Sequence, residues 1–270
     1  MKRTTGGAGL LVYAVFYLAF LYVPVLFLPL FSFNDSPFIA FPLSGFTTRW
    51  YAQLFADTAV QGALFNSLRV GAAAAIIATA LGLPAAKALT RYRVPGGSAV
   101  LGLANLSLFI PEIVLGISLL VLLNVVAVSL SLWTVVLGHI VICVPFAITV
   151  LMSRMEGFDR NLEEASLDLG EGTWMTFWRV TFPLALPGIV SSLLLCFMVS
   201  FDDFLIAYFL AGNETTLPIY IWGQLRFPYK LPAVLALGAL ILVTSTALVV
   251  IAEWIRSRGL EERRHRMVGA

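Results

Sequence analysis

Long apolar runs separated by short polar segments dominate this chain. Six such runs lie at residues 10–31, 64–89, 100–126, 133–152, 184–210 and 234–254. Each is about as long as the roughly 20 residues that a helix needs to cross a bilayer. None shows the period-two alternation expected of membrane β-strands of about 10 residues. Because backbone groups in lipid must be satisfied within the segment, the pattern predicts an all-α, polytopic membrane protein with six transmembrane helices.

Composition supports this interpretation. Hydrophobic residues make up 60% of the chain and charged residues 12%, whereas ordinary soluble domains carry about 25% charged residues. Lys2 and Arg3 precede the first run, as in a secretory signal. Its apolar core is longer than the usual 7–15 residues or so, and no small-x-small cleavage site follows. The polar stretches leave no room for a second soluble domain, so we expect a single transmembrane domain over residues 1–270.

The distribution of Lys and Arg predicts an orientation. If the amino terminus is cytoplasmic, most of the basic residues fall on the inner side, including the tail residues Arg256, Arg258, Arg263, Arg264 and Arg266. The outer side then receives Arg49, Arg69, Arg226 and Lys230. Since basic residues favour cytoplasmic loops, both termini are expected in the cytoplasm. The net charge of +2 therefore reflects topology and gives no indication of nucleic-acid binding.

A charged segment between the fourth and fifth runs contains ordered local signals. Asn161 could cap a short helix over residues 162–169, with Glu163 and Glu164 favourable in its first turn. Gly170 would end this helix in the left-handed conformation. A second short helix, over residues 173–180, would then lead to Pro183 at the start of the fifth span. By itself this pattern also fits a solvated amphipathic connector.

The same segment carries a more specific spacing. Glu164-Ala165-Ser166, then Gly170, then Val180-Thr181-Phe182-Pro183 resemble the EAA loop of ABC importer permeases. Further matching stretches are SFNDS, FTTRWYAQLF, IPEIVLGISLL, SFDDFLIAYFLAG and TTLPIYI. Over nearly its whole length, the chain resembles a type I ABC importer permease of the spermidine/putrescine group. It departs from the family pattern at Ser166, Glu171 and Leu235.

The resemblance implies a function and a set of partners. The loop 154–182 would hold a cytoplasmic coupling helix that receives force from an ATPase through Glu163, Glu164, Ala165, Ser166, Asp168 and Gly170. ATP and Mg²⁺ would bind that ATPase, so this chain would hold no cofactor, metal or catalytic residue. The partners would be a second homologous permease, two ATPase subunits, a periplasmic or lipid-tethered binding protein and the lipid of a bacterial inner membrane. The solute would be putrescine or spermidine, or else another amine, an aminophosphonate or ferric ion.

Three acids lie inside apolar runs, where such residues usually face a cavity or a partner. These acids are Glu112, Asp202 and Asp203, and by the helical rise all three belong in the outer half. Pro111 should kink the third span, so Glu112 could simply occupy the start of a half-helix. Asp202 and Asp203 should point about 100° apart on a continuous helix. One would then face the solute route and the other would bind a neighbouring helix or subunit.

Aromatic residues accompany these acids. Phe201, Phe204 and Tyr208 could contact an ammonium group through their ring faces, although each could equally be a lipid or core contact. His139, Cys143 and Cys196 are interpreted as packing residues, because none has the spacing of a metal or redox site. An intramembrane aspartyl protease would need acids from two different helices, and a stand-alone secondary transporter would leave the charged loop unexplained.

Overall fold

The computed structural model describes residues 6–39, 41–92 and 94–247, with side chains from residue 9 onward. The helices are α1 (Gly6–Ser32), α2 (Arg49–Ala56), α3 (Thr58–Arg91), α4 (Gly97–Phe109), α5 (Glu112–Val125), α6 (Leu132–Glu156), α7 (Asn161–Asp168), α8 (Thr173–Thr176), η1 (Phe177–Thr181), α9 (Phe182–Asp202), α10 (Leu205–Leu210), α11 (Leu217–Leu225) and η2 (Pro228–Lys230). A final helical stretch continues to Ala247. Among these residues the only β-type pairing is an isolated bridge between Asn34 and Phe46. The prediction of an all-α protein is confirmed.

The predicted spans correspond to long apolar helices. Five stretches in the described part of the chain are long and apolar enough to cross a membrane, namely Gly9–Ser32, Thr58–Arg91, Leu132–Glu156, Thr173–Asp202 and Pro228–Ala247. The remaining predicted span, the third one at residues 100–126, corresponds to the pair α4 and α5, which together pass the same test. Six spans therefore result when this pair is counted as one. The end of the last predicted run, beyond residue 247, lies outside the described residues.

The third predicted span is a sharp turn rather than a kinked rod. Its two halves are bent by 103°, with Ile110 and Pro111 in extended conformations. Pro111 lacks the N–H of a helical turn and disfavours helical geometry at the residue before it. The bend at Pro111 is confirmed. The depth that we assigned to Glu112 assumed one straight helix, and that assumption is wrong.

The fifth predicted span also differs from expectation at both ends. α9 stops at Asp202 because Asp203 is extended, with ψ 124°, so the 100° separation of the two aspartates on one helix is wrong. At the other end, the predicted separate helix over residues 173–180 is instead continuous with α9 through η1. The Phe182 N–H bonds the Phe177 carbonyl, five residues back. Pro183 has no N–H to offer, and a π-type turn accommodates this.

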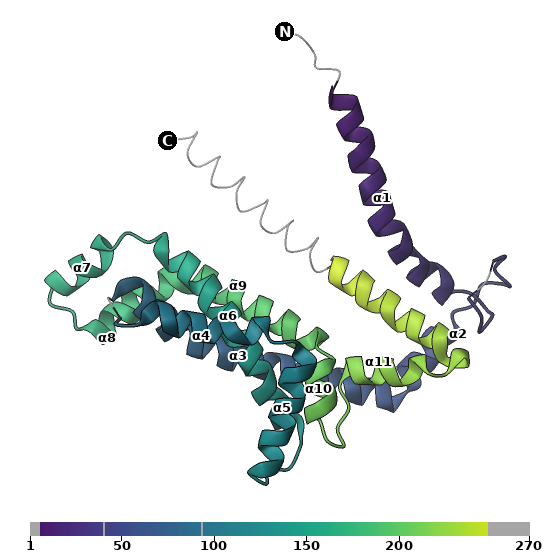
Figure 1. Cartoon of the computed structure of the whole chain (residues 1–270). Coiled ribbons are helices and arrows are strands. Elements are labelled where there is room, and N and C mark those ends of the chain that lie inside the picture. Colours follow the sequence, from purple (N-terminus) through teal and green to yellow (C-terminus); the bar gives the residue numbers. More distant parts are fainter. Residues whose placement is uncertain (1–5, 40, 93, 248–270) are drawn as a thin grey trace. The chain divides into compact units, whose positions relative to one another are not determined.

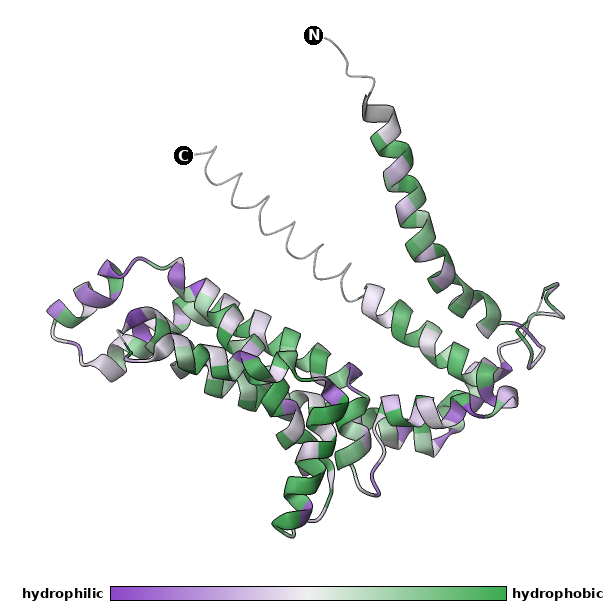
Figure 2. Ribbon diagram, viewed as in Figure 1, coloured by the Kyte–Doolittle hydropathy of each residue, from purple (hydrophilic) through white to green (hydrophobic). Residues whose placement is uncertain are grey.

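The chain divides into two compact units, each described here by itself. Unit 1 comprises residues 1–60 and 221–270, and unit 2 comprises residues 61–220. In unit 2, α7 and α8 lie together at one end, whereas α5 and α10 lie side by side toward the other (Figure 1). Hydrophilic residues predominate in α7, whereas α5, α6 and α9 are mostly hydrophobic (Figure 2).

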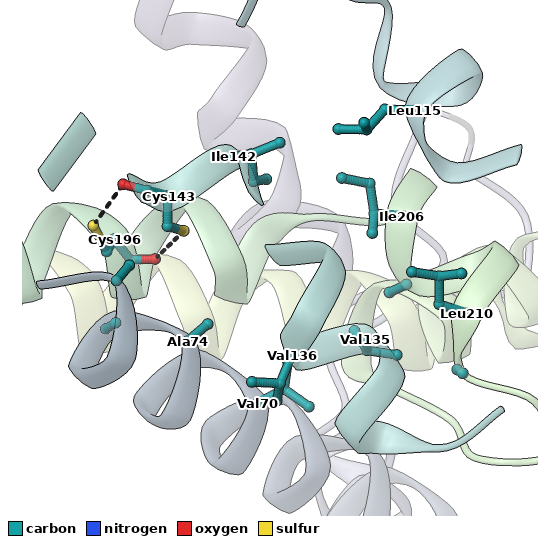
Figure 3. Packing of buried hydrophobic residues seen from close by; sticks show 14 of the residues in the cluster. Val70, Ala74, Leu115, Val135, Val136, Ile142, Cys143, Cys196, Ile206 and Leu210 are labelled. Carbon is teal, nitrogen blue, oxygen red and sulfur yellow. Dashed lines mark hydrogen bonds between the residues drawn. The ribbon is translucent and has the colours of Figure 1, made fainter. Parts of the chain in front are cut away.

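Small side chains allow α6 and α9 to pack closely in unit 2. The thiols of Cys143 and Cys196 are fully buried and unbridged. Each thiol donates to the other residue's carbonyl, at 3.5 and 3.4 Å (Figure 3). Nearby, the hydroxyls of Thr79 on α3 and Ser192 on α9 lie 2.9 Å apart. The two cysteines are core residues, as the sequence predicts.

Unit 1 holds a small polar network between α1 and α2. The Trp50 indole donates to the Asn34 carbonyl at 2.8 Å, and the hydroxyls of Ser32 and Tyr51 lie 2.6 Å apart. Trp50 and Leu54 are buried by the protein itself. The amphipathic side of α2 therefore contributes to the core of this unit.

We expect Gly138→Ala to destabilise unit 2. A Cβ at this position would lie 2.5 Å from Ile206 Cγ2 and 2.7 Å from Leu210 Cδ1, so α10 would have to move away from α6. Overpacking of this kind costs about 1–3 kcal/mol. Thermal unfolding of the purified protein measures the loss. Gly62→Ala is the matched control, since no atom lies within 4 Å of its added Cβ. Equal melting temperatures for the two variants would contradict the packing seen here.

Candidate functional site

The loop between α6 and α9 (residues 154–182, the α7 loop) is built from local signals. The Asn161 N–H is accepted by the Asp159 carboxylate at 3.0 Å, and Arg160 occupies the N-cap position. The prediction that Asn161 caps this helix is therefore wrong, because the acid two residues earlier satisfies that N–H. Glu163 and Glu164 lie in the first turn as predicted, where the positive end of the helix dipole favours acidic side chains.

Gly170 ends α7, as predicted. Its φ is +89°, a conformation that glycine adopts without steric cost. The Gly170 N–H bonds the Leu167 carbonyl at 2.9 Å, and the Glu171 N–H bonds the Ser166 carbonyl at 3.2 Å. This is the hydrogen-bond pattern of a Schellman motif. The chain reverses here because Gly170 satisfies the last carbonyls of the helix.

The six residues predicted to couple to an ATPase lie on two different faces of α7. Those that are exposed are Glu164, Ala165, Asp168 and Gly170. Glu163 and Ser166 are partly buried and point into the protein, where the hydroxyls of Ser166 and Thr176 lie 3.0 Å apart. Ser166, which departs from the family pattern, thus forms a hydrogen bond within the loop. Glu171, a second departure, forms an ion pair with Arg179.

The exposed side of the α7 loop also carries large apolar residues that were not among the predicted site residues. Leu162 is half exposed, Leu169 is 86% exposed and Trp174 is 71% exposed. Apolar residues within a short, charged helix were the signal available in the sequence. Where exposed apolar groups form a contiguous patch, they mark an interaction surface.

Glu163 binds two basic residues at the end of α3. The distances to its carboxylate are 3.8 Å from Lys87 Nζ and 3.3 Å from Arg91 Nε. The Thr181 hydroxyl, at the end of η1, also donates to this carboxylate. In the sequence, Lys87 and Arg91 were recognisable only as topology signals. Their pairing with Glu163 depends on how α7 folds back, which the sequence did not reveal.

At the α5–α10 end of unit 2, Asp203 is held inside the protein. His139 Nε2 on α6 lies 3.1 Å from its Oδ1 atom, and the same oxygen accepts the N–H groups of Ile206 and Ala207 at 3.0 and 3.2 Å. The other imidazole nitrogen, Nδ1, is 2.6 Å from the Ser200 hydroxyl. His139 is therefore a buried hydrogen-bonding residue, in agreement with the prediction.

Asp202 lies in a different environment from its neighbour. Its side chain is exposed, as are those of Glu112 and Tyr208, while Phe201 and Phe204 are partly buried. The ring centroids of Phe204 and Tyr208 lie 5.3 Å apart, with the ring planes tilted by 42°. α5, which begins at Glu112, packs on α10, and an added Cβ on Gly116 would lie 3.6 Å from the Ile206 Cα. The structure thus places the helix that begins at Glu112 beside the helix that follows Asp203, and it exposes Asp202 at the break between α9 and α10.

Comparison with known proteins shows extensive similarity. A family model described as "Binding-protein-dependent transport system inner membrane component" matches residues 78–259. The spermidine/putrescine transport system permease protein PotC of Haemophilus influenzae is 37% identical, over 88% of this chain and 92% of the relative. The putrescine transport system permease protein PotI of Escherichia coli is 34% identical, over 90% of this chain and 89% of the relative.

Solved structures show the same fold. A bacterial ABC transporter involved in import of the acidic polysaccharide alginate matches with a TM-score of 0.71 at 18% identity, over 95% of this chain and 96% of that chain. The MetNI methionine ABC transporter matches with a TM-score of 0.56, over 76% of this chain and 95% of that chain. The chain therefore belongs to the family of binding-protein-dependent transport system inner membrane components and is a multi-pass permease subunit of the inner membrane.

Proposed function

We propose that this chain is the translocating subunit of an ATP-driven importer that moves putrescine or spermidine into the cytoplasm. The observation that carries this proposal is its similarity, at 34–37% identity over about nine tenths of the chain, to permeases that are named for those polyamines. Exposed acids inside apolar segments support it, because a polycation needs anionic groups in place of lost water. The chain itself performs no chemistry, and a partner ATPase binds ATP and Mg²⁺.

The partners follow from the same family. The importer would contain this chain, a second homologous permease, two ATPase subunits and a periplasmic or lipid-tethered binding protein. Both termini and the α7 loop would be cytoplasmic, in keeping with the basic residues near them. The exposed apolar residues Leu162, Leu169 and Trp174, beside the acids of α7, suit a groove on an ATPase. Glu164, Ala165, Asp168 and Gly170 would contribute to the same contact.

Among the membrane acids, Asp202 and Glu112 are the better candidates for the solute route. The Oδ1 atom of Asp203 already accepts two backbone hydrogen bonds and pairs with His139, so releasing this carboxylate to a transient ligand would be costly. Asp202 is exposed two residues before Phe204 in the sequence, and Tyr208 lies on the next helix. A carboxylate and aromatic rings in the same short segment suit an alkylammonium group.

The test is uptake by the complex reconstituted in proteoliposomes with its ATPase and binding protein. We expect putrescine or spermidine to stimulate ATP hydrolysis and to accumulate inside, whereas amino acids, aminophosphonates and ferric ion do not. Stimulation by an anionic or neutral solute would refute the polyamine assignment. Uptake without any ATPase would instead indicate a secondary transporter.

We also expect Asp202→Asn to raise the KM for polyamine uptake by about five- to tenfold, since one charge contact of about 1 kcal/mol is lost. The protein should remain as stable as before, because Asp202 is exposed. Asp35→Asn is the control, since it removes an exposed acid that pairs with Arg49 in unit 1. A KM that is unchanged for Asp202→Asn would exclude this carboxylate from the route.

A further inference from the structure

We propose that Glu163 is a positioning residue that joins α7 to α3, so that a displacement of α7 reaches the second span as well as the fourth and fifth. It would act inside the permease and make no contact with the ATPase. The inference rests on the proposed function, because it concerns how force applied to α7 is distributed.

The connectivity of the chain gives α3 no direct backbone link to α7. α7 is joined through the backbone to α6 on one side and to α8, η1 and α9 on the other. Motion of α7 therefore reaches the fourth and fifth spans directly. α3 packs on these spans, for example at Thr79 and Ser192, but a direct link from α7 to α3 requires side-chain contacts.

Glu163 supplies the charged contacts of this kind. Its carboxylate pairs with Lys87 and Arg91, one turn apart on α3, and accepts the Thr181 hydroxyl at the junction with α9. Lys87 Nζ also donates to that hydroxyl oxygen at 3.4 Å. One carboxylate thus connects three elements. A second link is peripheral, since the exposed Arg160 guanidinium donates to the Thr90 carbonyl at 2.8 Å.

Because the three charged side chains are largely buried, the linkage between α7 and α3 is stiff. The exposed fractions of the side chains are 14% for Lys87, 7% for Arg91 and 16% for Glu163. Separating α7 from α3 would leave two largely buried cations without their carboxylate, and an unpaired buried charge is strongly unfavourable. Arg91 Nε and Nη2 have no hydrogen-bond partner among the described residues, so Arg91 and Glu163 form an ion pair without a hydrogen bond. The cluster therefore depends on Glu163 for its compensation, and α7 and the end of α3 should move together.

Neighbouring glutamates then have separate roles. Glu164, the glutamate of the EAA-like spacing, is exposed on the side that carries Ala165 and Asp168, whereas Glu163 faces α3. Loss of Glu164 would weaken contact with the ATPase. Loss of Glu163 would leave that contact in place but would weaken the link between α7 and α3, in which the exposed hydrogen bond from Arg160 to Thr90 would remain.

The test compares uptake with ATP hydrolysis in the reconstituted complex. For Glu163→Lys we expect the amount of polyamine taken up per ATP hydrolysed to fall by about tenfold, the size of a typical pair interaction expressed as a ratio. Adding Arg91→Glu should restore the ratio, because the double variant again places one acid between two cations. Glu171→Gln is the control, since it removes an exposed ion pair of the same loop and should leave the ratio unchanged.

The ratio separates the linkage from a folding defect, because fewer intact complexes would lower uptake and hydrolysis equally. If Glu163→Lys does not insert, the milder Glu163→Gln variant is measured instead, and the same ratio decides. An unaltered ratio, or a double variant no better than the single one, would overturn the linkage. A wild-type complex that hydrolyses ATP but takes up no polyamine would instead refute the proposed function.

Discussion

Replacement of Gly170 by Arg is expected to abolish solute uptake while the protein still inserts into the membrane. Gly170 has a φ of +89°, where a side chain costs roughly 1–2 kcal/mol. That strain alone would shift the equilibrium between the native loop and other loop conformations by about tenfold away from the native one. The long cationic side chain would also lie on the exposed side of α7, among groups proposed to contact the ATPase. Because Gly170 is exposed and belongs to a loop, the spans themselves should be unaffected.

Two further variants separate strain from bulk. Gly170→Ala introduces strain alone and should reduce uptake by at most about tenfold. Gly172→Arg introduces the same bulk and charge two residues later, where φ is −75° and no atom lies within 4 Å of an added Cβ. It should retain most uptake. Membrane abundance, co-purification of the ATPase and initial uptake rates are the measurements. Full uptake by Gly170→Arg would exclude a coupling role for the α7 loop.

Asp203→Ala is expected to cause a large loss of stability. The substitution removes the partner of the buried His139 and leaves the N–H groups of Ile206 and Ala207 unbonded at the start of α10. Leaving a buried polar group without its hydrogen-bond partner typically costs about 1–3 kcal/mol, and we expect about 3 kcal/mol here. Because α10 is held at its first turn by this carboxylate, its packing against α6 should loosen as well.

Denaturant or thermal unfolding of the purified protein checks this expectation. Asp202→Ala is the matched control, since the adjacent exposed carboxylate should contribute less than about 0.5 kcal/mol. A double-mutant cycle with His139→Ala should give a coupling free energy of about 1–2 kcal/mol, within the range for residues in one hydrogen-bonded network. Similar losses for the two aspartate variants would show that Asp203 does not have the structural role assigned to it.

Local chemistry determines much of this protein. The length of the apolar runs and the cost of unsatisfied backbone groups in lipid are enough to predict that the chain is helical and that it has six spans. Gly170 could be predicted to end α7, because the left-handed backbone conformation depends only on the residue at that position and on its neighbours in the chain. The EAA-like spacing from Glu164 to Pro183 identified the family, which the similarity to known permeases confirms.

Only the tertiary structure decided which of two adjacent acids faces the protein. Glu163 and Glu164 are equivalent in the first turn of α7, and so are Asp202 and Asp203 in a continuous helix. Their roles differ because Lys87 and Arg91 come from α3, and His139 comes from α6. By contrast, Pro111 marked the position of the bend after α4 in the sequence, but not its angle of 103°, and the break before α10, which Asp203 caps locally, was not predicted. Contacts between distant segments leave no periodic signal in a single chain, so the sequence could place these residues near a site without assigning their partners.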